Sequence, residues 1–201
     1  MVEVVIATKN EKKLRELKRY LKGIKARIVS LNEMGHSPRI KEDSGTFKGN
    51  AVKKAGAVSR FTKGIVLADD SGLEVDILGG QPGVMSARFA GNRKKDRDNN
   101  SKLLKMLEGI PSKDRSARFV CAIAIADNGK VVKVIEEYCK GRIALSIRGA
   151  HGFGYDPLFL IPRYNRTFGE LGLKIKDKMS HRSKALKKAR KFLRSYFALQ
   201  S

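Results

Sequence analysis

The chain has 201 residues, 41% of them hydrophobic, so it can bury one sizeable core but is too short for a long string of modules. Its 43 Lys and Arg residues outnumber its 20 Asp and Glu residues, and the net charge of +23 favours anionic partners without identifying them. No apolar run is long enough to span a membrane, and Glu3 stands where a secretory signal would carry Lys or Arg. We therefore expect a cytoplasmic protein with no membrane partner. Cys121 and Cys139 lie outside any zinc-binding spacing and are expected to be reduced.

The first half of the chain alternates strand and helix signals. Short β-branched runs predict strands, leucines and alanines at a spacing of three to four residues predict helices, and polar stretches with Gly and Pro predict loops. In chain order, the expected elements are a strand at 2–7, a helix carrying Leu14, Leu17 and Leu21, a strand at 27–31, a loop at 34–46, a helix at 47–61 capped by Thr46, and a strand at 65–68 that ends at Asp69.

The second half begins with an extended pattern and contains a clear hairpin signal, because Asn128 and Gly129 stand between two apolar runs. In chain order, we expect an extended segment at 73–78, a turn at 79–83, a helix at 97–107, paired strands at 118–126 and 130–138, a turn-rich segment at 149–162, and a last helix after Ser180 with an apolar stripe from Ala185 to Phe197. Strands mixed with helices, including one antiparallel pair, predict an α/β fold with a mixed β-sheet flanked by helices.

Two acidic pairs are candidate metal-binding or water-orienting groups. Asp69 and Asp70 follow an apolar run, and a carboxylate there could bind Mg²⁺ or orient a water molecule for attack on phosphorus. If the strand continues through them, the two side chains point to opposite faces. The alternative is that both residues end the strand and start a turn. Glu42 and Asp43 form the second pair, for which a solvated loop is the alternative.

The segment Thr8–Lys13 is a candidate phosphate-binding loop. It follows a predicted strand and opens a predicted helix, so backbone N–H groups, the helix dipole, the Thr8 hydroxyl and the Lys13 ammonium could meet a phosphate group. The alternative is a lysine-rich first turn that faces solvent.

Two further segments could recognise a ligand. Lys176 and the run Ser180-His181-Arg182 could bind an anion, although such residues also occur as surface decoration. The segment Gly152–Pro157 places aromatic side chains beside Asp156, which suits stacking on a base and accepting from its N–H group. By itself this segment is equally typical of a packed turn.

In combination, these segments resemble the Ham1/inosine triphosphate pyrophosphatase family, also described as XTP/dITP diphosphatases. The resemblance extends from Val4 to about Ala189, nearly the whole chain. It rests on the order and spacing of ATKNEKKLREL, EDSGTFKGNAVKKA, ADDSGLEVDILGGQPGVMSARFAG, GFGYDPLFLIP, TFGEL and KDKMSHRSKAL.

The resemblance implies an enzyme that hydrolyses a deaminated purine nucleoside triphosphate (dITP, ITP or XTP) to the monophosphate and pyrophosphate with Mg²⁺, and so cleanses the nucleotide pool. It implies an elongated mixed α/β domain spanning residues 1–201, with two lobes around a central cleft, and a homodimer. The implied roles are phosphate binding by Thr8, Lys9, Asn10, Glu11, Lys12 and Lys13, metal binding by Glu42 and Asp70, proton acceptance by Asp70, and substrate contacts by Ser71, Phe153, Gly154, Tyr155, Asp156, Lys176, His181 and Arg182.

The residue chemistry is consistent with this function. Transfer at phosphorus needs cations to offset the charge on the leaving pyrophosphate and a carboxylate to steer water. His181 and Arg182 are donors of the kind that would favour a purine O6 over the amino group of adenine. Asp43 could share or replace the metal role of Glu42, and His151 could narrow the base pocket.

Two other functions stay open at this point. The basic residues concentrated between Lys174 and Arg194 could bind nucleic acid, which would make the chain a nucleic-acid-binding protein on the same scaffold. A Maf-type nucleotide pyrophosphatase would instead prefer pyrimidine or modified nucleotides. A nucleotide panel distinguishes these alternatives from the purine-specific enzyme.

Overall fold

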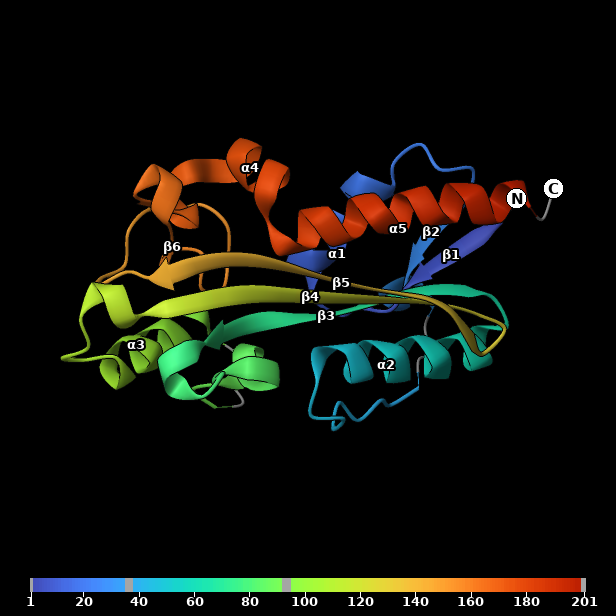
Figure 1. Cartoon of the computed structure of the whole chain (residues 1–201). Helices are drawn as coiled ribbons and strands as arrows, with labels where there is room; N and C mark the ends of the chain where they lie inside the picture. Colours follow the sequence, from blue (N-terminus) through green and yellow to red (C-terminus); the bar gives the residue numbers. More distant parts are fainter. Residues whose placement is uncertain (1, 35–37, 92–94, 200–201) are drawn as a thin grey trace. The chain divides into compact units, whose positions relative to one another are not determined.

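The structure is a computed structural model that describes residues 2–34, 38–91 and 95–199. Its strands form one seven-stranded sheet in the order β2-β1-β3-β4-β5-β6-β7 (Figure 1). β1 (Glu3–Ile6) pairs in parallel with β2 (Arg27–Ser30) and with β3 (Ile65–Val75). β6 (Phe159–Ile161) pairs antiparallel with β5 (Lys130–Ile143) and with β7 (Arg166–Thr167). The predicted α/β fold with a mixed sheet is confirmed.

Five α-helices accompany the strands in the described part of the chain. They are α1 (Glu11–Leu21), α2 (Phe47–Thr62), α3 (Asp96–Met106), α4 (Phe168–Met179) and α5 (His181–Ala198). Side chains cap the first two as residue type leads one to expect: Asn10 accepts from the N–H groups of Lys12 and Lys13, and Thr46 accepts from Gly49. Of the loop predicted at 34–46, residues 35–37 lie outside the described residues.

The sequence analysis missed the short strands β6, which lies inside the predicted turn-rich segment 149–162, and β7, which follows it, and it also missed helix α4. Gly169 and Gly172 interrupt its apolar pattern, and Gly172 has a positive φ of 68° at a kink inside the helix. A local signal was nevertheless present, since Thr167 and Glu170 form a capping box at its start.

Strand β3 is longer than predicted and corrects the expectation of a strand ending at Asp69. It runs without interruption from Ile65 to Val75, so Asp69 and Asp70 lie inside it and do not start a turn. Aspartate is unfavourable in strands, so a prediction based on the apolar run 65–68 ended the strand too early. Tertiary contacts of the two carboxylates, described below, outweigh that local preference.

The predicted hairpin is confirmed. β4 (Ser116–Asp127) and β5 are neighbours in the sheet and are joined by Asn128 and Gly129, whose φ angles are 47° and 84°. Positive φ at both central residues is the geometry of a type I′ turn, which matches the twist of the two strands.

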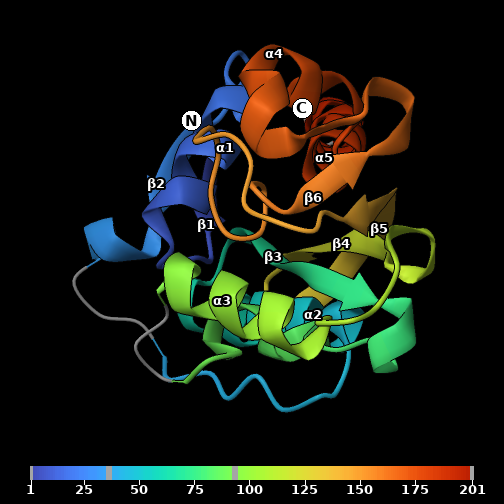
Figure 2. The same cartoon turned by 90° about the vertical axis from the view of Figure 1, so that its left-hand side faces the viewer.

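The chain forms two compact units. Unit 1 comprises Met1–Asp70, Cys121–Glu137 and Arg182–Ser201. In this unit α1 and α5 cover one face of the strands and α2 the other (Figures 1 and 2). The core on the α1/α5 face contains Val4, Ile6, Leu14, Leu17, Leu21, Ile65, Leu67, Cys121, Ile123, Ile125, Ala185, Leu186, Ala189 and Leu193. The alternation along β1, β3 and β4 thus presents every second residue to the two helices.

Unit 2 comprises Ser71–Val120 and Tyr138–His181 and has its own core. That core includes Leu103 and Leu107 from the α3 region, Phe168 from α4, and the strand residues Leu73, Val75, Phe119, Ile143 and Phe159. Phe119 and Phe159 are in ring contact, with centroids 4.3 Å apart. Over the described residues, no helix combines the length and the apolar character that crossing a membrane requires.

Candidate active site

Asp69 and Asp70 project from opposite faces of β3. Asp69 continues the series of Ile65 and Leu67, which face α1 and α5, whereas Asp70 belongs to the alternate series that faces α2. Both side chains are buried, with 1% and 9% exposure. A carboxylate at such depth must be balanced by cations or hydrogen bonds. Lys13 and Arg182 form ion pairs with Asp69 and Asn50 donates to Asp70, while the charges of Lys13 and Lys54 act on both.

Asp69 is balanced by cations. Its Oδ2 lies 3.2 Å from Lys13 Nζ and 3.5 Å from Arg182 Nε. Burial by itself would raise the pKa of Asp69, but the charges of Lys13, Arg182 and Lys54 outweigh it and lower the pKa to about 2. Asp69 is therefore ionised at any physiological pH and fixes the Lys13 ammonium at the first turn of α1.

Arg182 has a second carboxylate partner. Its Nη1 donates to Glu16 Oε2 at 2.7 Å, and its side chain is only 6% exposed. Burial would lower the pKa of this guanidinium, but Asp69 and Glu16 raise it. Arg182, which the resemblance assigns to recognition of the nucleobase, thus connects the start of α5 to α1 and β3 within unit 1.

Asp70 is held by an amide donor from α2. Asn50 Nδ2, on α2, donates to Asp70 Oδ2 at 3.0 Å, and Asn50 Oδ1 accepts from the Ser44 hydroxyl at 2.8 Å. The pKa of Asp70 is raised, chiefly by burial; Lys13, Lys54 and the Asn50 hydrogen bond oppose the shift, and Glu42 adds to it. A carboxylate with a raised pKa is a better proton acceptor than an ordinary one.

Lys54 links the acidic groups of unit 1. Its ammonium forms an ion pair with Glu42 and donates to the backbone carbonyl of Asp69 at 3.1 Å. Burial would lower the pKa of Lys54, but the charges of Glu42, Asp69 and Asp70 outweigh it and raise the pKa. Three carboxylates therefore act on one cation at this point.

The second acidic residue of the loop has other partners. Asp43 is exposed, forms an ion pair with Lys53 and lies 3.9 Å from Lys41 Nζ. Of the two residues that the sequence left as metal-binding alternatives, Glu42 is the one whose carboxylate reaches Lys54 and acts electrostatically on Asp70.

The loop before α1 has the geometry of an anion-binding helix start. Thr8 is buried two residues after the end of β1, and its Oγ1 accepts from the Asn10 N–H at 3.2 Å. Asn10 caps the helix, and exposed Lys9 and Lys12 flank it. Glu11 is turned aside, since its Oε1 accepts from Asn32 at 2.6 Å. The helix dipole and Lys13 together make this end of α1 electropositive.

In unit 2, Lys176 and Asp156 form a buried ion pair. Lys176 Nζ lies 2.5 Å from Asp156 Oδ2, and the two side chains are 5% and 2% exposed. The same oxygen accepts from the Phe153 N–H at 2.8 Å, and the Lys176 ammonium lies 4.7 Å from the centre of the Phe153 ring. Gly152 is required beside them, because its φ is +81° and a Cβ atom would lie 2.0 Å from Asp156 Oδ2.

The next residues of this loop are held by α3. Gly154 N–H donates to Asp96 Oδ2 at 2.9 Å, and Gly154 O accepts from Asn100 Nδ2 at 3.0 Å. The buried Tyr155 hydroxyl donates to the Ser86 carbonyl at 2.9 Å, and burial raises the pKa of Tyr155. The segment 153–156 is thus a rigid turn with Phe153 half-buried at its start.

Two remaining predicted site residues also belong to unit 2. Ser71 is half-buried and follows Asp70 in β3. His181 is 4% exposed and stacks on Phe119, with ring centroids 4.7 Å apart and an interplanar angle of 15°.

The carboxylates of unit 1 suit a magnesium ion. Among residues 2–34, 38–91 and 95–199, no group of three or more His, Cys, Asp or Glu side chains could hold a metal ion. Mg²⁺ does not need three protein ligands, because it is usually held by one or two carboxylates together with water and substrate phosphates. Glu42 and Asp70 are hard oxygen donors near one half-buried cation, Lys54, so a cation is already favoured there. The donor set fits Mg²⁺.

Sequence reasoning missed four positioning residues: Asn50, Lys54, Asp96 and Asn100. Asn50 and Lys54 lie four residues apart, on one face of α2, inside a segment that carries the family resemblance. The available signal was an asparagine on the apolar face of the predicted helix, three residues after Phe47 and next to Ala51. For Asp96 and Asn100 no such signal exists, because their partner Gly154 is more than 50 residues away in sequence.

Comparison with known proteins identifies the family of this chain. A model of the Ham1 family matches residues 4–192. A Bacillus licheniformis protein named "dITP/XTP pyrophosphatase" is 52% identical over 188 residues, which cover 94% of this chain and 96% of that protein. A Desulforamulus reducens protein of the same name is 48% identical over 199 residues, 99% of each chain. The structure of a HAM1 protein from Coxiella burnetii superposes with a TM-score of 0.88 at 37% identity, over 96% of this chain and 98% of that one. The predicted resemblance is confirmed, and the chain belongs to the Ham1 family.

Proposed function

We propose that this chain hydrolyses deaminated purine nucleoside triphosphates such as dITP, ITP and XTP to the monophosphate and pyrophosphate, and that it needs Mg²⁺ to do so. In this reaction the oxygen of a water molecule bonds to phosphorus, the phosphoanhydride bond between the α- and β-phosphates breaks, and its electron pair leaves with pyrophosphate. One proton of the water must be accepted by the enzyme or by solvent.

The observation that carries the proposal is the cluster in unit 1, where Glu42, Asp69 and Asp70 act on Lys13 and Lys54 beside the start of α1. Hydrolysis of a nucleoside triphosphate requires cations that bind the phosphates and carboxylates that bind a metal ion and orient water. This cluster supplies both kinds of group. The two relatives named dITP/XTP pyrophosphatase support the choice of deaminated purines.

The phosphate groups would be bound by the loop Thr8–Lys13. The N–H groups at the start of α1 and the ammonium of Lys13 donate to anions, and the buried Asp69 keeps Lys13 charged and in position. Glu42 and Asp70 would hold Mg²⁺, which when bound offsets the charge of the phosphates.

Asp70 would accept the proton of the attacking water. Burial raises its pKa, which strengthens it as a base, while the hydrogen bond from Asn50 Nδ2 orients its carboxylate. Asn50 is in this account a positioning residue for Asp70.

The nucleoside contacts follow the roles that the family resemblance implies. Phe153 would stack on the purine and Tyr155 and Asp156 would fix the turn that presents it, with Gly154 held by α3. Lys176 would act through Asp156 and Phe153, the groups that it contacts. We assign Ser71 to the substrate and His181 and Arg182 to selectivity for the purine O6.

Pyrophosphate release across a nucleotide panel tests the function. We expect turnover of dITP, ITP and XTP, at least about 100-fold lower kcat/KM for dATP and for pyrimidine triphosphates, and loss of activity in EDTA that Mg²⁺ restores. The matched comparison is the Asp70→Asn variant under identical conditions. Equal rates on pyrimidine nucleotides would contradict the purine assignment, and full activity in EDTA would contradict the metal assignment.

The resemblance also implies a homodimer in the cytoplasm, and we keep both as parts of the proposal. Light scattering coupled to size-exclusion chromatography tests the first: a mass near twice 22.3 kDa is expected, and the monomer mass at micromolar concentration would contradict it.

A further inference from the structure

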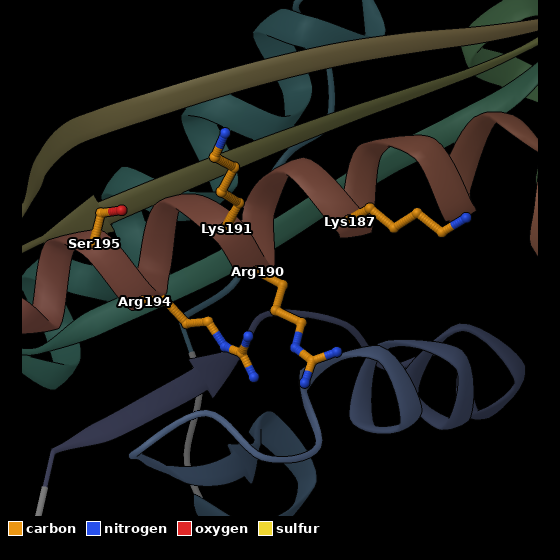
Figure 3. A pocket seen from close by; sticks show the side chains of 5 residues that line it. All are labelled: Lys187, Arg190, Lys191, Arg194 and Ser195. Carbon is orange, nitrogen blue, oxygen red and sulfur yellow. The ribbon is translucent and has the colours of Figure 1, made fainter.

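The outer face of α5 carries a basic pocket that the proposed reaction does not use. This pocket, of about 300 Å³, is lined by Lys187, Arg190, Lys191, Arg194 and Ser195 (Figure 3). All five residues come from one helix, at the i, i+3 and i+4 spacings that place side chains on the same face. Arg190 and Arg194 extend side by side from the helix (Figure 3).

This arrangement is electrostatically unfavourable for the protein alone. Like charges three and four residues apart on a helix destabilise it, and no Asp or Glu occurs anywhere between 181 and 198 to offset them. Other cations of the same helix have acidic partners: Arg182 contacts Glu16, and Lys188 pairs with Glu137. In the part of the chain that the structure describes, Arg190, Lys191 and Arg194 have no carboxylate partner.

Arg190 gives a second, independent sign of a missing anion. Its Nε atom is buried and has no hydrogen-bond partner among the described residues. A guanidinium N–H removed from water without an acceptor is costly, and rotation of the Arg190 side chain toward an oxyanion in the pocket would supply that acceptor.

The basic surface continues beyond the helix. Arg194 Nη2 lies 3.5 Å from the carbonyl oxygen of Gly23, in the turn after α1, and Gly23 is flanked by the exposed residues Lys22 and Lys25. From Lys187 to Arg194 the helix rises about 10 Å, so the cations form a row and not a single point. A row suits a chain of phosphates better than one isolated ion.

We propose that this face of α5 binds the phosphate backbone of a single-stranded nucleic acid. Each phosphate would accept charge-assisted hydrogen bonds from successive cations, with Arg190 and Arg194 as the central pair. Binding here is separate from hydrolysis, since none of the lining residues belongs to the site described above. The net charge of +23 would steer such polyanions toward the protein.

The test compares two double variants that remove the same charge. Arg190→Gln/Arg194→Gln alters the pocket, whereas Lys105→Gln/Lys113→Gln removes two exposed lysines elsewhere. A fluorescent 12-nucleotide single-stranded DNA and a labelled inorganic polyphosphate are titrated by anisotropy from 50 to 200 mM salt. Hydrolysis of dITP by each variant, which should equal that of the unaltered protein, verifies the fold.

We expect Arg190→Gln/Arg194→Gln to weaken binding of the DNA about fivefold and to lower its salt slope by about 1.4, two contacts of about 0.7 each. The control should leave both unchanged. Weaker binding of polyphosphate alone, with DNA binding unchanged, would overturn the proposal and identify inorganic polyphosphate as the ligand. Equal affinities for the two double variants, or no binding of either probe by the unaltered protein, would overturn the proposal, while leaving the hydrolase function untouched.

Discussion

Asp69 and Asp70 are neighbours in sequence but face opposite sides of one continuous strand, Asp69 toward Lys13 and Arg182 and Asp70 toward Asn50. The two carboxylates therefore have different roles. Asp69, with a pKa of about 2, is a permanent counter-charge, whereas Asp70, with a raised pKa, is suited to accept a proton. These two roles, and the contacts of the neighbouring elements, can be tested by substitution.

Replacing Asp70 should abolish chemistry without unfolding the protein. For Asp70→Asn we expect kcat for dITP to fall about 10³-fold, because the amide cannot accept the proton of the attacking water, with a smaller change in KM. Steady-state pyrophosphate release measures both constants. The exposed Asp114→Asn is the control and should match the unaltered protein. Activity of Asp70→Asn within about tenfold would refute the base assignment.

Replacing Asn50 should shift the pH profile. The hydrogen bond from Asn50 lowers the pKa of Asp70 against the effect of burial, so Asn50→Ala should raise that pKa and move the acidic limb of the kcat/KM profile to higher pH. Ser44→Ala leaves the bond to Asp70 in place and serves as the control. Profiles from pH 5 to 9 decide the question: an unmoved acidic limb in Asn50→Ala would show that Asp70 does not govern it.

Asp69 should contribute to stability in a pH-dependent way. Its folded pKa of about 2 lies below its unfolded value, so its contribution is fully present above about pH 5 and is lost as the pH falls toward 2. We expect Asp69→Asn to lower the free energy of unfolding by about 2 to 3 kcal/mol at pH 6. Urea titrations should show this gap narrowing by about 1 kcal/mol at pH 3. A gap that stays constant with pH would contradict the ionised pair.

The contacts of α3 with Gly154 should matter for substrate binding. Asn100→Ala removes the donor to Gly154 O, so the turn that presents Phe153 loses one of its two supports, and KM for dITP should rise about three- to tenfold with a smaller change in kcat. Asp96→Ala should act alike, whereas Asp98→Ala, exposed in the same first turn, should not. A kcat loss at constant KM in Asn100→Ala would place the defect elsewhere.

Cys121 should be inert toward thiol reagents. It is fully buried, and burial together with Asp69 raises its pKa to about 12, so almost no thiolate exists at pH 8. Both cysteines are free thiols in the structure, as predicted. Reaction with a disulfide reagent should be slow in buffer and yield two thiols in urea; rapid labelling of Cys121 in buffer would contradict its burial.

The sequence predicted those parts of the fold that depend on local pattern. The helix cap at Thr46 and the turn at Asn128-Gly129 were predictable because residue type alone favours their backbone geometry. The full length of β3 was not, since its two aspartates are unfavourable in a strand and are stabilised there by Lys13 and Asn50, which come from other elements.

The site was predictable to a similar degree. The resemblance pointed to the acidic loops and to Lys13, but it could not tell which groups support them. Lys54, Asn100 and the burial of Lys176 against Asp156 depend on contacts between distant segments, and no spacing in the chain encodes those contacts.

The ion pairs of Lys54 have a consequence for the order of folding and metal binding. Because its ammonium, with Lys13 and Arg182, already neutralises the acidic groups of unit 1, the polypeptide can reach its native state before any divalent ion arrives. Chelator-treated protein should therefore keep its melting temperature to within about 3 °C while losing its activity. The metal ion would then be required for catalysis and not for the stability of the fold.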